Sequence, residues 1–446
     1  MTLQKIKEKK AHIGIIGLGY VGLPLTIAFC KAGFRVTGLD IDQEKIERLN
    51  AGEIPIYEPG LKTLVKKNVN KGRLHFSANI SKTIQKSDIV FIAVGTPQGS
   101  NGEANLSAVE AVAKTIGENL NGYKIVCTKS TVPIGTGKRI EEIIRSVNSM
   151  GDFDYVSNPE FLREGAAVKD FLHPDRVVIG TRTQKAIDLM GEVYRPLYIN
   201  ETPILSTSVE TAEMIKYAAN AFLSLKISYI NEIANLCEFV GADVHDVTRA
   251  MGLDGRISSK FLHPGPGYGG SCFPKDTHAL AATGQKYGSP LRTIEAAIKT
   301  NESQKVRMVE KLSRLMGDSF NGKTIAVLGL AFKPQTDDVR EAASRVIVSK
   351  LVELGASVHA YDPIAMDNFK NHFPHIKYFD SWQDAVKSAD GCIILTEWNE
   401  FRGLDLNELK DLMRFPVILD TKNILSIQGL ESCGFTFDNV GRKLHQ

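Results

Sequence analysis

The sequence predicts an α/β fold in which two doubly wound parallel sheets, one in each half of the chain, are joined by a long central helix. In both halves, apolar runs of strand length alternate with helical stretches, which predicts parallel strands linked by helical crossovers. The two halves also repeat the same order of elements, as a duplicated domain would. Between them, residues 209–240 contain no Gly or Pro and place apolar residues at helical spacing.

The N-terminal half is predicted to be a Rossmann-like domain. A strand at 13–16 meets a Gly-rich turn, and the helix that follows ends near Gly33. A second strand at 35–39 is closed by Asp40, and a third strand is expected at 88–94. Units of this length favour right-handed crossovers between parallel strands.

The C-terminal half is predicted to be a second Rossmann-like domain built to the same plan. Its expected elements are a strand at 324–328 meeting Gly329, a helix from about 340 to Gly355, a strand at 357–361 closed by Asp362, and a third strand at 391–395. Only Gly329 of the three turn glycines is retained, and Lys333 lies in the turn. We therefore expect a different nucleotide here, with Lys333 either meeting a diphosphate or lying in a surface loop.

Residues 209–240 are predicted to form one helix of roughly 45 Å, at ~1.5 Å per residue. This is longer than one domain needs, so we expect it to connect the two sheets and to offer a face for a homodimer. The charges at positions 213, 216, 226 and 232 exclude a membrane span. The expected domains are 1–206, 207–318 with the helix and a Gly-rich cysteine loop, and 319–446.

The composition is that of an ordinary globular protein. Of 446 residues, 43% are hydrophobic and 24% are charged, which excludes disorder and coiled coil. The net charge of +3, with no long run of one sign, argues against nucleic acid as a partner. The six cysteines are scattered singly, so we expect no disulfide framework, no metal site and a reducing, cytoplasmic location. Glycines and Pro24 interrupt the apolar stretch 13–30, which favours a buried strand and turn over a signal peptide.

Gly17, Gly19 and Gly22 form a G-x-G-x-x-G turn between a predicted strand and a predicted helix. Such glycines provide the tight turn, the close approach to a pyrophosphate and the close helix packing that dinucleotide binding needs. Asp40, at the end of the next strand, is placed to accept hydrogen bonds from ribose hydroxyls and to repel a 2′-phosphate, which favours NAD over NADP. Lys45 lies nearby and is a further candidate contact.

Cys272 follows a loop rich in Gly and Pro at 265–270, and such a loop lets backbone and ligand approach closely. Lys275 and Asp276 place both charges beside it, and a nearby cation lowers the pKa of a thiol. Cys272 is therefore a candidate nucleophile. The other cysteines lie in strand-like or helix-like runs and are expected to be packing residues. They are Cys30, Cys127, Cys237, Cys392 and Cys433.

The order of several motifs resembles the UDP-glucose/GDP-mannose dehydrogenase family over about residues 13–423. The cysteine motif is the most specific, and its form at 271–276 is closest to that of members acting on UDP-glucose. The motifs are GLGYVGLP at 17–24, VGTP at 94–97, STVPIGT at 130–136, NPEFLREG at 158–165, GYGGSCFPKD at 267–276 and GLAFKP at 329–334.

The resemblance implies an NAD-dependent four-electron oxidation of the C6 alcohol of a nucleotide sugar to a carboxylate. Cys272 would capture the intermediate aldehyde, and water would hydrolyse the resulting thioester. Lys216 and Asn220, four residues apart on one helix face, would stabilise the oxyanion. From spacing alone, Lys216 could instead pair with Glu213 on a solvated face.

Further residues carry roles by resemblance. Glu160 would be the general base, and Asp276 and Thr131 would position water or the reacting hydroxyl. Added candidate contacts to NAD are Thr96, Ser130 or Thr131, Glu164, Lys275 and Arg340. Candidate contacts to the sugar nucleotide are Glu160, Phe161, Leu162, Lys216, Asn220, Arg256, Phe261, Gly269 and Lys333, of which Arg256 could be supplied by a neighbouring subunit.

One departure keeps the substrate open. Where many family members read Asp-Gly-Arg, residues 420–423 read Asp-Thr-Lys-Asn, and Lys422 lacks the bidentate fork of arginine. A UDP-N-acetylhexosamine or GDP-mannose is therefore an alternative substrate. A two-electron β-hydroxyacid dehydrogenase would have no use for the cysteine loop, and a silent nucleotide-sugar-binding protein need not keep the catalytic candidates together.

Overall fold

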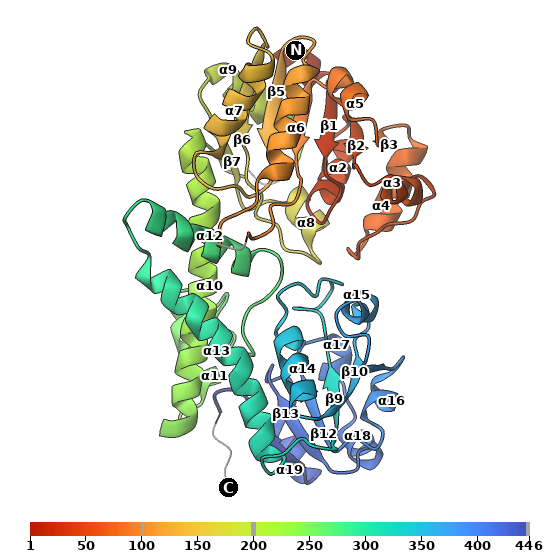
Figure 1. The fold of residues 1–446 in the computed structure, drawn as a ribbon, viewed down its shortest axis with the longest axis vertical. Helices are drawn as coiled ribbons and strands as arrows, with labels where there is room; N and C mark the ends of the chain where they lie inside the picture. The colour runs from red at the N-terminus through yellow and green to blue at the C-terminus, as the bar shows by residue number, and fades with distance from the viewer. Residues whose placement is uncertain (100–101, 198–201, 443–446) are drawn as a thin grey trace. The chain divides into compact units, whose positions relative to one another are not determined.

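The computed structural model describes residues 1–99, 102–197 and 202–442, and it divides into two compact units, Met1–Ala219 and Asn220–Gln446. Each unit is an α/β domain built on one sheet, as the sequence predicts (Figure 1). Helix α10, Val209–Val240, runs without a break through the boundary between the units, which confirms the helix predicted over 209–240.

The first unit contains an eight-stranded sheet in the order β3-β2-β1-β4-β5-β6-β7-β8. Its strands are β1 (His12–Ile16), β2 (Arg35–Leu39), β3 (Leu74–Ser77), β4 (Ile89–Ile92), β5 (Lys124–Thr128), β6 (Phe153–Ser157), β7 (Val177–Thr181) and β8 (Ile204–Thr207). All adjacent pairs are parallel except β6 and β7, which are antiparallel. The expected parallel sheet therefore holds for β1 to β6, and the reversal at β7 leaves no trace in hydrophobic periodicity.

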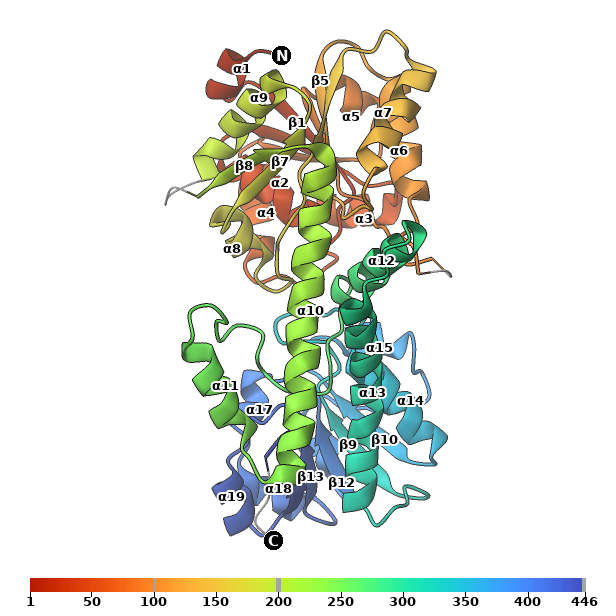
Figure 2. The same ribbon diagram turned by 90° about the vertical axis from the view of Figure 1, so that its left-hand side faces the viewer.

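Helices cover both faces of this sheet. Figure 2 shows α5, α6 and α7 on one side and α1, α8 and α9 on the other, and each side has its own apolar core. The helices are α1 (Leu3–Lys7), α2 (Gly22–Lys31), α3 (Gln43–Asn50), α4 (Leu61–Asn70), α5 (Ile80–Lys86), α6 (Ser107–Glu118), α7 (Thr136–Val147), α8 (Ala167–Leu172) and α9 (Gln184–Tyr194), followed by a 3-10 turn (Arg195–Leu197).

The second unit contains a six-stranded, wholly parallel sheet in the order β11-β10-β9-β12-β13-β14. Its strands are β9 (Thr324–Leu328), β10 (Ser357–Tyr361), β11 (Lys377–Tyr378), β12 (Gly391–Ile394), β13 (Val417–Asp420) and β14 (Thr436–Asp438). This order repeats that of the first six strands of the other unit, which confirms the predicted internal repeat.

The helices of the second unit are α11 (Val244–Leu253), α12 (Phe273–Lys286), α13 (Arg292–Leu315), α14 (Ala343–Glu353), α15 (Met366–Lys370), α16 (Trp382–Val386), α17 (Asn399–Arg402), α18 (Leu406–Leu412) and α19 (Ile427–Ser432). Helix α14 begins at Ala343, slightly later than the predicted start near 340. Gln335 and Glu341 have φ of 64° and 49°, and this left-handed backbone keeps the preceding segment out of the helix.

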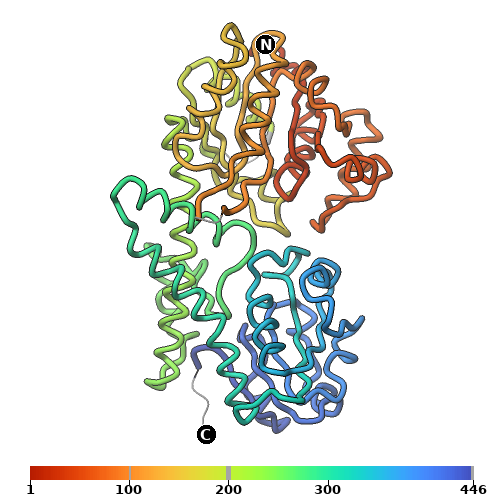
Figure 3. Tube along the Cα trace, viewed as in Figure 1, coloured from red at the N-terminus to blue at the C-terminus, as the bar shows by residue number. Residues whose placement is uncertain are grey.

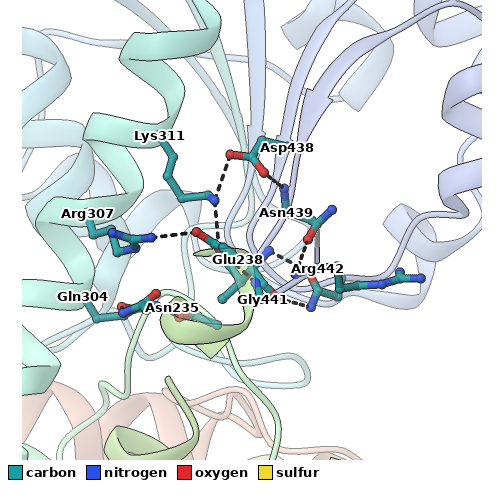
Figure 4. Close-up of polar contacts among 12 residues, drawn as sticks. Asn235, Glu238, Gln304, Arg307, Lys311, Asp438, Asn439, Gly441 and Arg442 are labelled. Atoms are coloured by element: carbon teal, nitrogen blue, oxygen red, sulfur yellow. Dashed lines mark hydrogen bonds and ion pairs between the residues drawn. The ribbon is translucent and has the colours of Figure 1, made fainter. Parts of the chain in front are cut away.

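The second half of α10 is tied to the end of the described chain (Figure 3). The carboxylate of Glu238 accepts hydrogen bonds from Arg307 at 2.6 Å, from Lys311 at 2.9 Å and from the backbone N–H of Gly441 at 2.9 Å (Figure 4). Lys311 also pairs with Asp438 of β14 at 2.8 Å. A buried ionic cluster therefore joins α10, α13 and the residues after β14.

Candidate active site

The Gly-rich turn after β1 has the geometry that a dinucleotide cradle requires. Gly17 has φ of 98°, and a Cβ atom there would lie 2.6 Å from the carbonyl oxygen of Ala93. A Cβ at Gly22, the first residue of α2, would collide with the carbonyl oxygen of Gly17. At Gly19, no described atom lies within 4 Å of the Cβ position, so this side of the turn is open to a ligand.

Asp40 lies at the end of β2, beside the same turn. Its Oδ2 accepts the Leu18 N–H at 3.0 Å and pairs with Lys45 Nζ at 2.9 Å, while Oδ1 accepts the Asp42 N–H at 3.2 Å. Burial alone would raise the pKa of Asp40, but these hydrogen bonds and the Lys45 cation hold it below its usual value. Asp40 and Lys45, both predicted cofactor contacts, are thus brought together.

The corresponding residue of the second unit, Asp362, has different surroundings. The turn itself is repeated, since the Gly17 and Gly329 N–H groups each donate to the carbonyl at the end of the neighbouring strand at 2.8 Å. Asp362 is fully buried. Its donors are the backbone N–H groups of Leu330, Ala331, Ile364 and Ala365 and the indole N–H of Trp398. This carboxylate is occupied by its own domain, which fits the expectation that the second unit does not hold a dinucleotide in the same way.

The loops after β4 and β5 are joined by two hydroxyl groups. Thr96 donates from Oγ1 to the Thr131 carbonyl at 2.9 Å, and Ser130 donates from Oγ to the Val94 carbonyl at 2.7 Å. These bonds bring together three of the predicted cofactor contacts. They follow strands β4 and β5, and β4 lies directly beside β1, the strand that the Gly-rich turn follows. Glu164, another candidate, lies partly buried in the loop between β6 and α8.

Glu160 and Lys216 form a buried ion pair in the first unit. Glu160 Oε1 lies 3.1 Å from Lys216 Nζ, and both residues are at most 5% exposed. Glu160 Oε2 accepts the N–H of Leu162, which fixes the carboxylate within its own loop. The Lys216 ammonium also lies 5.3 Å from the ring centroid of Phe161. The structure thus places Glu160 and Phe161 of the 158–165 motif beside Lys216.

Glu213 is not the partner of Lys216 that helical spacing allows. Its two carboxylate oxygens instead accept the backbone N–H groups of Gly135 and Gly137, each at 2.7 Å, at the start of α7. Gly135 has φ of 93°, which lets the loop present both donors. Burial raises the pKa of Glu213 to about 7, although the two backbone hydrogen bonds oppose the rise.

Cys272 lies immediately before α12, as its N-cap residue, is partly exposed and forms no disulfide. Ser271 Oγ lies 3.6 Å from its Sγ. The positive end of the helix dipole favours an anion at this position, so the site suits the nucleophilic thiolate.

Asp276, in the first turn of α12, is completely buried and binds two other predicted site residues. Asn220 Nδ2 donates to its Oδ2 at 2.6 Å, and Lys275 Nζ pairs with its Oδ1 at 2.5 Å. The charge of Lys275, which the sequence placed beside the thiol of Cys272, is therefore directed to Asp276.

Two glycines of the cysteine loop lie close to another segment of the chain. A Cβ at Gly269 would collide with the carbonyl oxygen of Glu341, and one at Gly270 would lie 2.8 Å from the ring of Phe332. The Gly270 N–H donates to the Arg340 carbonyl at 2.8 Å. The loop is thus packed against residues 330–342, which agrees with the close backbone approach predicted for these glycines.

The remaining candidates for the sugar nucleotide lie in the second unit. Arg256 is almost fully exposed and pairs with Asp254. Phe261 has φ of 65° and packs its ring 6.0 Å from that of Phe273. Lys333 Nζ lies 5.3 Å from the ring centroid of Phe332, and half-exposed Arg340, a cofactor candidate, pairs with Asp338 at 2.7 Å.

Lys422, the departure from the family pattern, also lies in the second unit. Its Nζ pairs with Glu397 at 2.8 Å, and a Cβ added at Gly265 would lie 3.7 Å from it. Of the cysteines expected to be packing residues, Cys30, Cys127, Cys237 and Cys392 are buried. Cys433 is partly exposed, because it caps the C-terminal end of the short helix α19.

Two charged residues near Glu160 were missed by the sequence analysis. The Arg176 guanidinium stacks 3.6 Å from the ring centroid of Phe161, and Lys129 is buried at the end of β5. Arg176 carries no motif signal. Lys129 carries a weak one, as a lysine directly after a fully apolar strand and directly before Ser130.

None of the helices in the described part of the chain combines the length and hydrophobicity that a bilayer span requires. In the same residues, His, Cys, Asp and Glu side chains do not gather in threes that could hold a metal ion.

Family models match the chain in three consecutive segments. Residues 11–198 match the NAD binding domain of the UDP-glucose/GDP-mannose dehydrogenase family, residues 210–303 match its central domain, and residues 326–427 match its UDP binding domain.

Relatives match over almost the whole chain. The UDP-glucose 6-dehydrogenases of Rhizobium meliloti (strain 1021) and Bacillus subtilis (strain 168) are each 49% identical, over 96% of this chain and 99% and 93% of their own. The solved structure of a UDP-glucose dehydrogenase from Pyrobaculum islandicum is 36% identical, with a TM-score of 0.90 over 97% of this chain and 98% of its own.

Proposed function

Because the chain belongs to the UDP-glucose/GDP-mannose dehydrogenase family, we propose that it is an NAD-dependent UDP-glucose 6-dehydrogenase. It oxidises the C6 alcohol of UDP-glucose to the carboxylate of UDP-glucuronate. The observation that carries this function is the near-complete match, at 49% identity, to two enzymes that bear that name. The cysteine loop and the turn between Gly17 and Asp40 supply the chemical parts that the reaction requires.

The residues of the first unit fit NAD. The open side of Gly19 admits a pyrophosphate, and Asp40 presents a carboxylate to ribose hydroxyls. Lys45, Thr96, Thr131 and Glu164 are further proposed contacts, together with Lys275 and Arg340 from the other unit. NAD supplies the hydride acceptor for each of the two oxidations.

Cys272 is proposed to carry the intermediates covalently. Its thiolate sulfur adds to the C6 aldehyde, and oxidation of this thiohemiacetal leaves a thioester. Water then adds to the thioester carbonyl, the carbon–sulfur bond breaks, and Cys272 leaves as the thiolate. The partly exposed thiol at the start of α12 supports this role.

Glu160 is proposed as the base that takes a proton from the attacking water. Its pairing with Lys216 supports this role, because the ion pair and the hydrogen bond from the Leu162 N–H hold the carboxylate in one place. Lys216 and Asn220 are proposed to stabilise the oxyanion, while Asp276 and Thr131 position water or the hydroxyl. The hydrogen bond from Asn220 to Asp276 holds that amide in a single orientation.

The sugar nucleotide is proposed to bind through the second unit's Lys333, Phe261 and Gly269 and through Phe161 and Leu162, with Arg256 available from another subunit. Domain boundaries at 1–206, 207–318 and 319–446 remain part of this proposal. Lys422 pairs with Glu397, so its cation is already partly neutralised where other members carry arginine.

We further propose a homodimer formed through α10. The helix exposes an apolar stripe at seven-residue spacing, with Phe222, Tyr229 and Leu236 between 46% and 61% exposed. A helix face of this kind suits the self-complementary contact of a two-fold dimer. None of the six cysteines, all of which lie in the described residues, forms a disulfide, which supports the proposed reducing cytoplasm.

A substrate panel tests the function. NADH formation is measured with UDP-glucose, UDP-N-acetylglucosamine, UDP-N-acetylmannosamine and GDP-mannose at equal concentration. UDP-glucose should give the highest kcat/KM, with two NADH formed per acid. A clear preference for another sugar would overturn the substrate assignment, and one NADH per product would overturn the four-electron reaction.

A further inference from the structure

The first unit buries a lysine that the proposed mechanism leaves without a role. Lys129 follows β5, is 4% exposed, and donates from Nζ to Asn158 Oδ1 at 3.0 Å and to the Tyr194 hydroxyl at 3.4 Å. Its ammonium lies 5.5 Å from the ring centroid of Phe171. Among the described residues, no carboxylate lies within ion-pairing distance of it. A buried cation without a carboxylate partner is costly, so its retention calls for a function.

Asn158 is the residue that Lys129 holds, and it begins the loop that carries Glu160. Its side-chain oxygen accepts from Lys129 and from the Tyr194 hydroxyl, and its amide donates to the Val178 carbonyl of β7 at 2.6 Å. Its backbone N–H donates to the carbonyl at the end of β5 at 2.9 Å. Only Pro159 separates Asn158 from Glu160, and its fixed φ leaves the loop little freedom.

Lys129 also acts on Glu160 through its charge. The carboxylate of Glu160 pairs directly with Lys216, and Lys129 interacts electrostatically with both of these groups. The other titratable groups facing Lys129 are Cys127 on its own strand and Tyr194 from α9. Burial lowers the pKa of Lys129 to about 8, although Cys127 and Glu160 oppose the fall. At neutral pH, Glu160 therefore faces two buried ammonium groups.

We propose that Lys129 is a positioning residue for thioester hydrolysis, which it serves by fixing the Asn158 end of the loop and by placing a second buried cation near the carboxylate of Glu160. This inference rests on the proposed function, because it assigns Glu160 the role of base toward water. Lys129 itself touches neither water nor substrate in this role. Its loss should slow the release of the acid from Cys272 and leave the earlier oxidation steps intact.

Two matched variants separate the hydrogen bond from the charge. Lys129→Met removes a donor to Asn158 Oδ1 and a cation, whereas Tyr194→Phe removes a donor to the same oxygen and no charge. The measurements are kcat and kcat/KM for UDP-glucose from pH 6 to 9, and the fraction of Cys272 carrying the acyl group after acid quench, by intact mass.

In Lys129→Met, kcat should fall at least about tenfold while kcat/KM changes little, because hydrolysis follows the steps that commit the substrate. The acyl enzyme should accumulate, and the acid limb of kcat should move to higher pH, because a buried cation that favours negative charge nearby is lost. Tyr194→Phe should lower kcat without moving that limb. Lys129→Arg, which keeps the charge, should restore the limb to its wild-type position.

Coincident pH profiles for Lys129→Met and Tyr194→Phe would overturn the electrostatic role. A parallel fall in kcat and kcat/KM without acyl enzyme would show a merely structural one and would overturn the proposal. Wild-type enzyme that forms no NADH with any nucleotide sugar would overturn the proposed function first, and the role of Lys129 with it. A working wild type with normal hydrolysis in Lys129→Met overturns the inference alone.

Discussion

Lys45 Nζ lies 2.9 Å from Asp40 Oδ2, so the carboxylate proposed to face the ribose carries a cation from its own domain. The pair lowers the pKa of Asp40, with help from two backbone N–H groups, and Asp40 stays ionised throughout any practical assay range. Asp40 therefore repels a 2′-phosphate while Lys45 attracts it, and mutating each residue in turn separates the two effects.

Replacing Asp40 with Asn should narrow the preference for NAD over NADP, because it removes the repulsion and leaves Lys45 free to attract the 2′-phosphate. Replacing Lys45 with Met should widen the preference for the opposite reason. The measurement is the ratio of kcat/KM for the two cofactors. An unchanged ratio in Asp40→Asn would mean that Asp40 does not face the ribose.

Cys272→Ala should form no sugar acid at a useful rate, since the aldehyde then has no nucleophile that converts it into a hydride donor. Cys272→Ser should trap the aldehyde slowly, and its oxygen ester, less reactive than a thioester, should appear as added mass on the intact protein. NADH and acid are measured together. Normal turnover of Cys272→Ala with two NADH per acid would end the covalent mechanism.

Asn220→Asp should make the activity depend on pH, with the higher activity at low pH. It places a second carboxylate within hydrogen-bonding distance of Asp276, because Asn220 Nδ2 lies 2.6 Å from Asp276 Oδ2 in the wild-type chain. Two adjacent carboxylates raise the pKa of one of them, so activity should fall with rising pH and recover partly at low pH. Asn220→Ala, the control, loses the same hydrogen bond and should show a pH-independent fall. Identical profiles would contradict the proximity of these two groups.

The raised pKa of Glu213 predicts how the stability of the fold changes with pH. Burial raises the pKa of Glu213 from 4.5 to about 7, so the folded chain binds more protons than the unfolded chain between these values. The stability that protonated Glu213 contributes is complete below pH 4.5 and is lost as the pH rises to about 7. The unfolding free energy of wild type relative to Glu213→Gln should therefore fall across this window.

Glu210→Gln is the matched control for this titration. The pKa of Glu210 is lowered, first by a hydrogen bond to its own backbone and then by Arg182, so its contribution is lost as pH falls. The slope relative to wild type should have the opposite sign, and it should lie below about pH 4.5, because the pKa of Glu210 is lowered from that value. Chemical denaturation from pH 3 to 8 measures both slopes, and a flat difference for Glu213→Gln would place the pKa of Glu213 near the ordinary value.

Leu236→Lys should weaken the proposed dimer, because it puts a charge at the C-terminal end of the apolar stripe of α10. Tyr287→Lys is the control, since Tyr287, which is 72% exposed against 55% for Leu236, lies at the end of α12 and outside the stripe. Light scattering after size exclusion gives the mass. Wild type and the control should have about twice the 49.0 kDa of one chain, and Leu236→Lys should approach the single-chain mass. A wild-type mass of one chain would contradict the dimer.

The fold was largely predictable because its elements are marked locally. Alternating apolar runs and glycines revealed both sheets, and the absence of Gly and Pro over 209–240 marked α10 to the residue. Strand direction is not a local property, so the antiparallel pairing of β6 and β7 could not be predicted.

The candidate site was predicted as a set of residues but not as a set of contacts. Spacing offered Glu213 as a partner for Lys216, but tertiary packing gives Lys216 to Glu160 and Glu213 to the start of α7. Asp40 and Asp362 hold the same place in the repeat, yet Asp362 is surrounded by donors from its own domain. Such differences arise from residues distant in sequence, which periodicity cannot report.

The cluster around Glu238 affects the order in which the chain can fold during synthesis on the ribosome. Glu238 accepts a hydrogen bond from Gly441, 203 positions later in the chain, and Lys311 forms an ion pair with Asp438. Synthesis proceeds from the N-terminus, so the first unit has all of its strands long before these partners emerge. Until then Glu238 and Lys311 can satisfy only each other and Arg307. The second half of the protein therefore completes its packing only after Asp438 and Gly441 have been synthesised, and a chain truncated before them would leave a partly buried carboxylate and a buried ammonium short of partners.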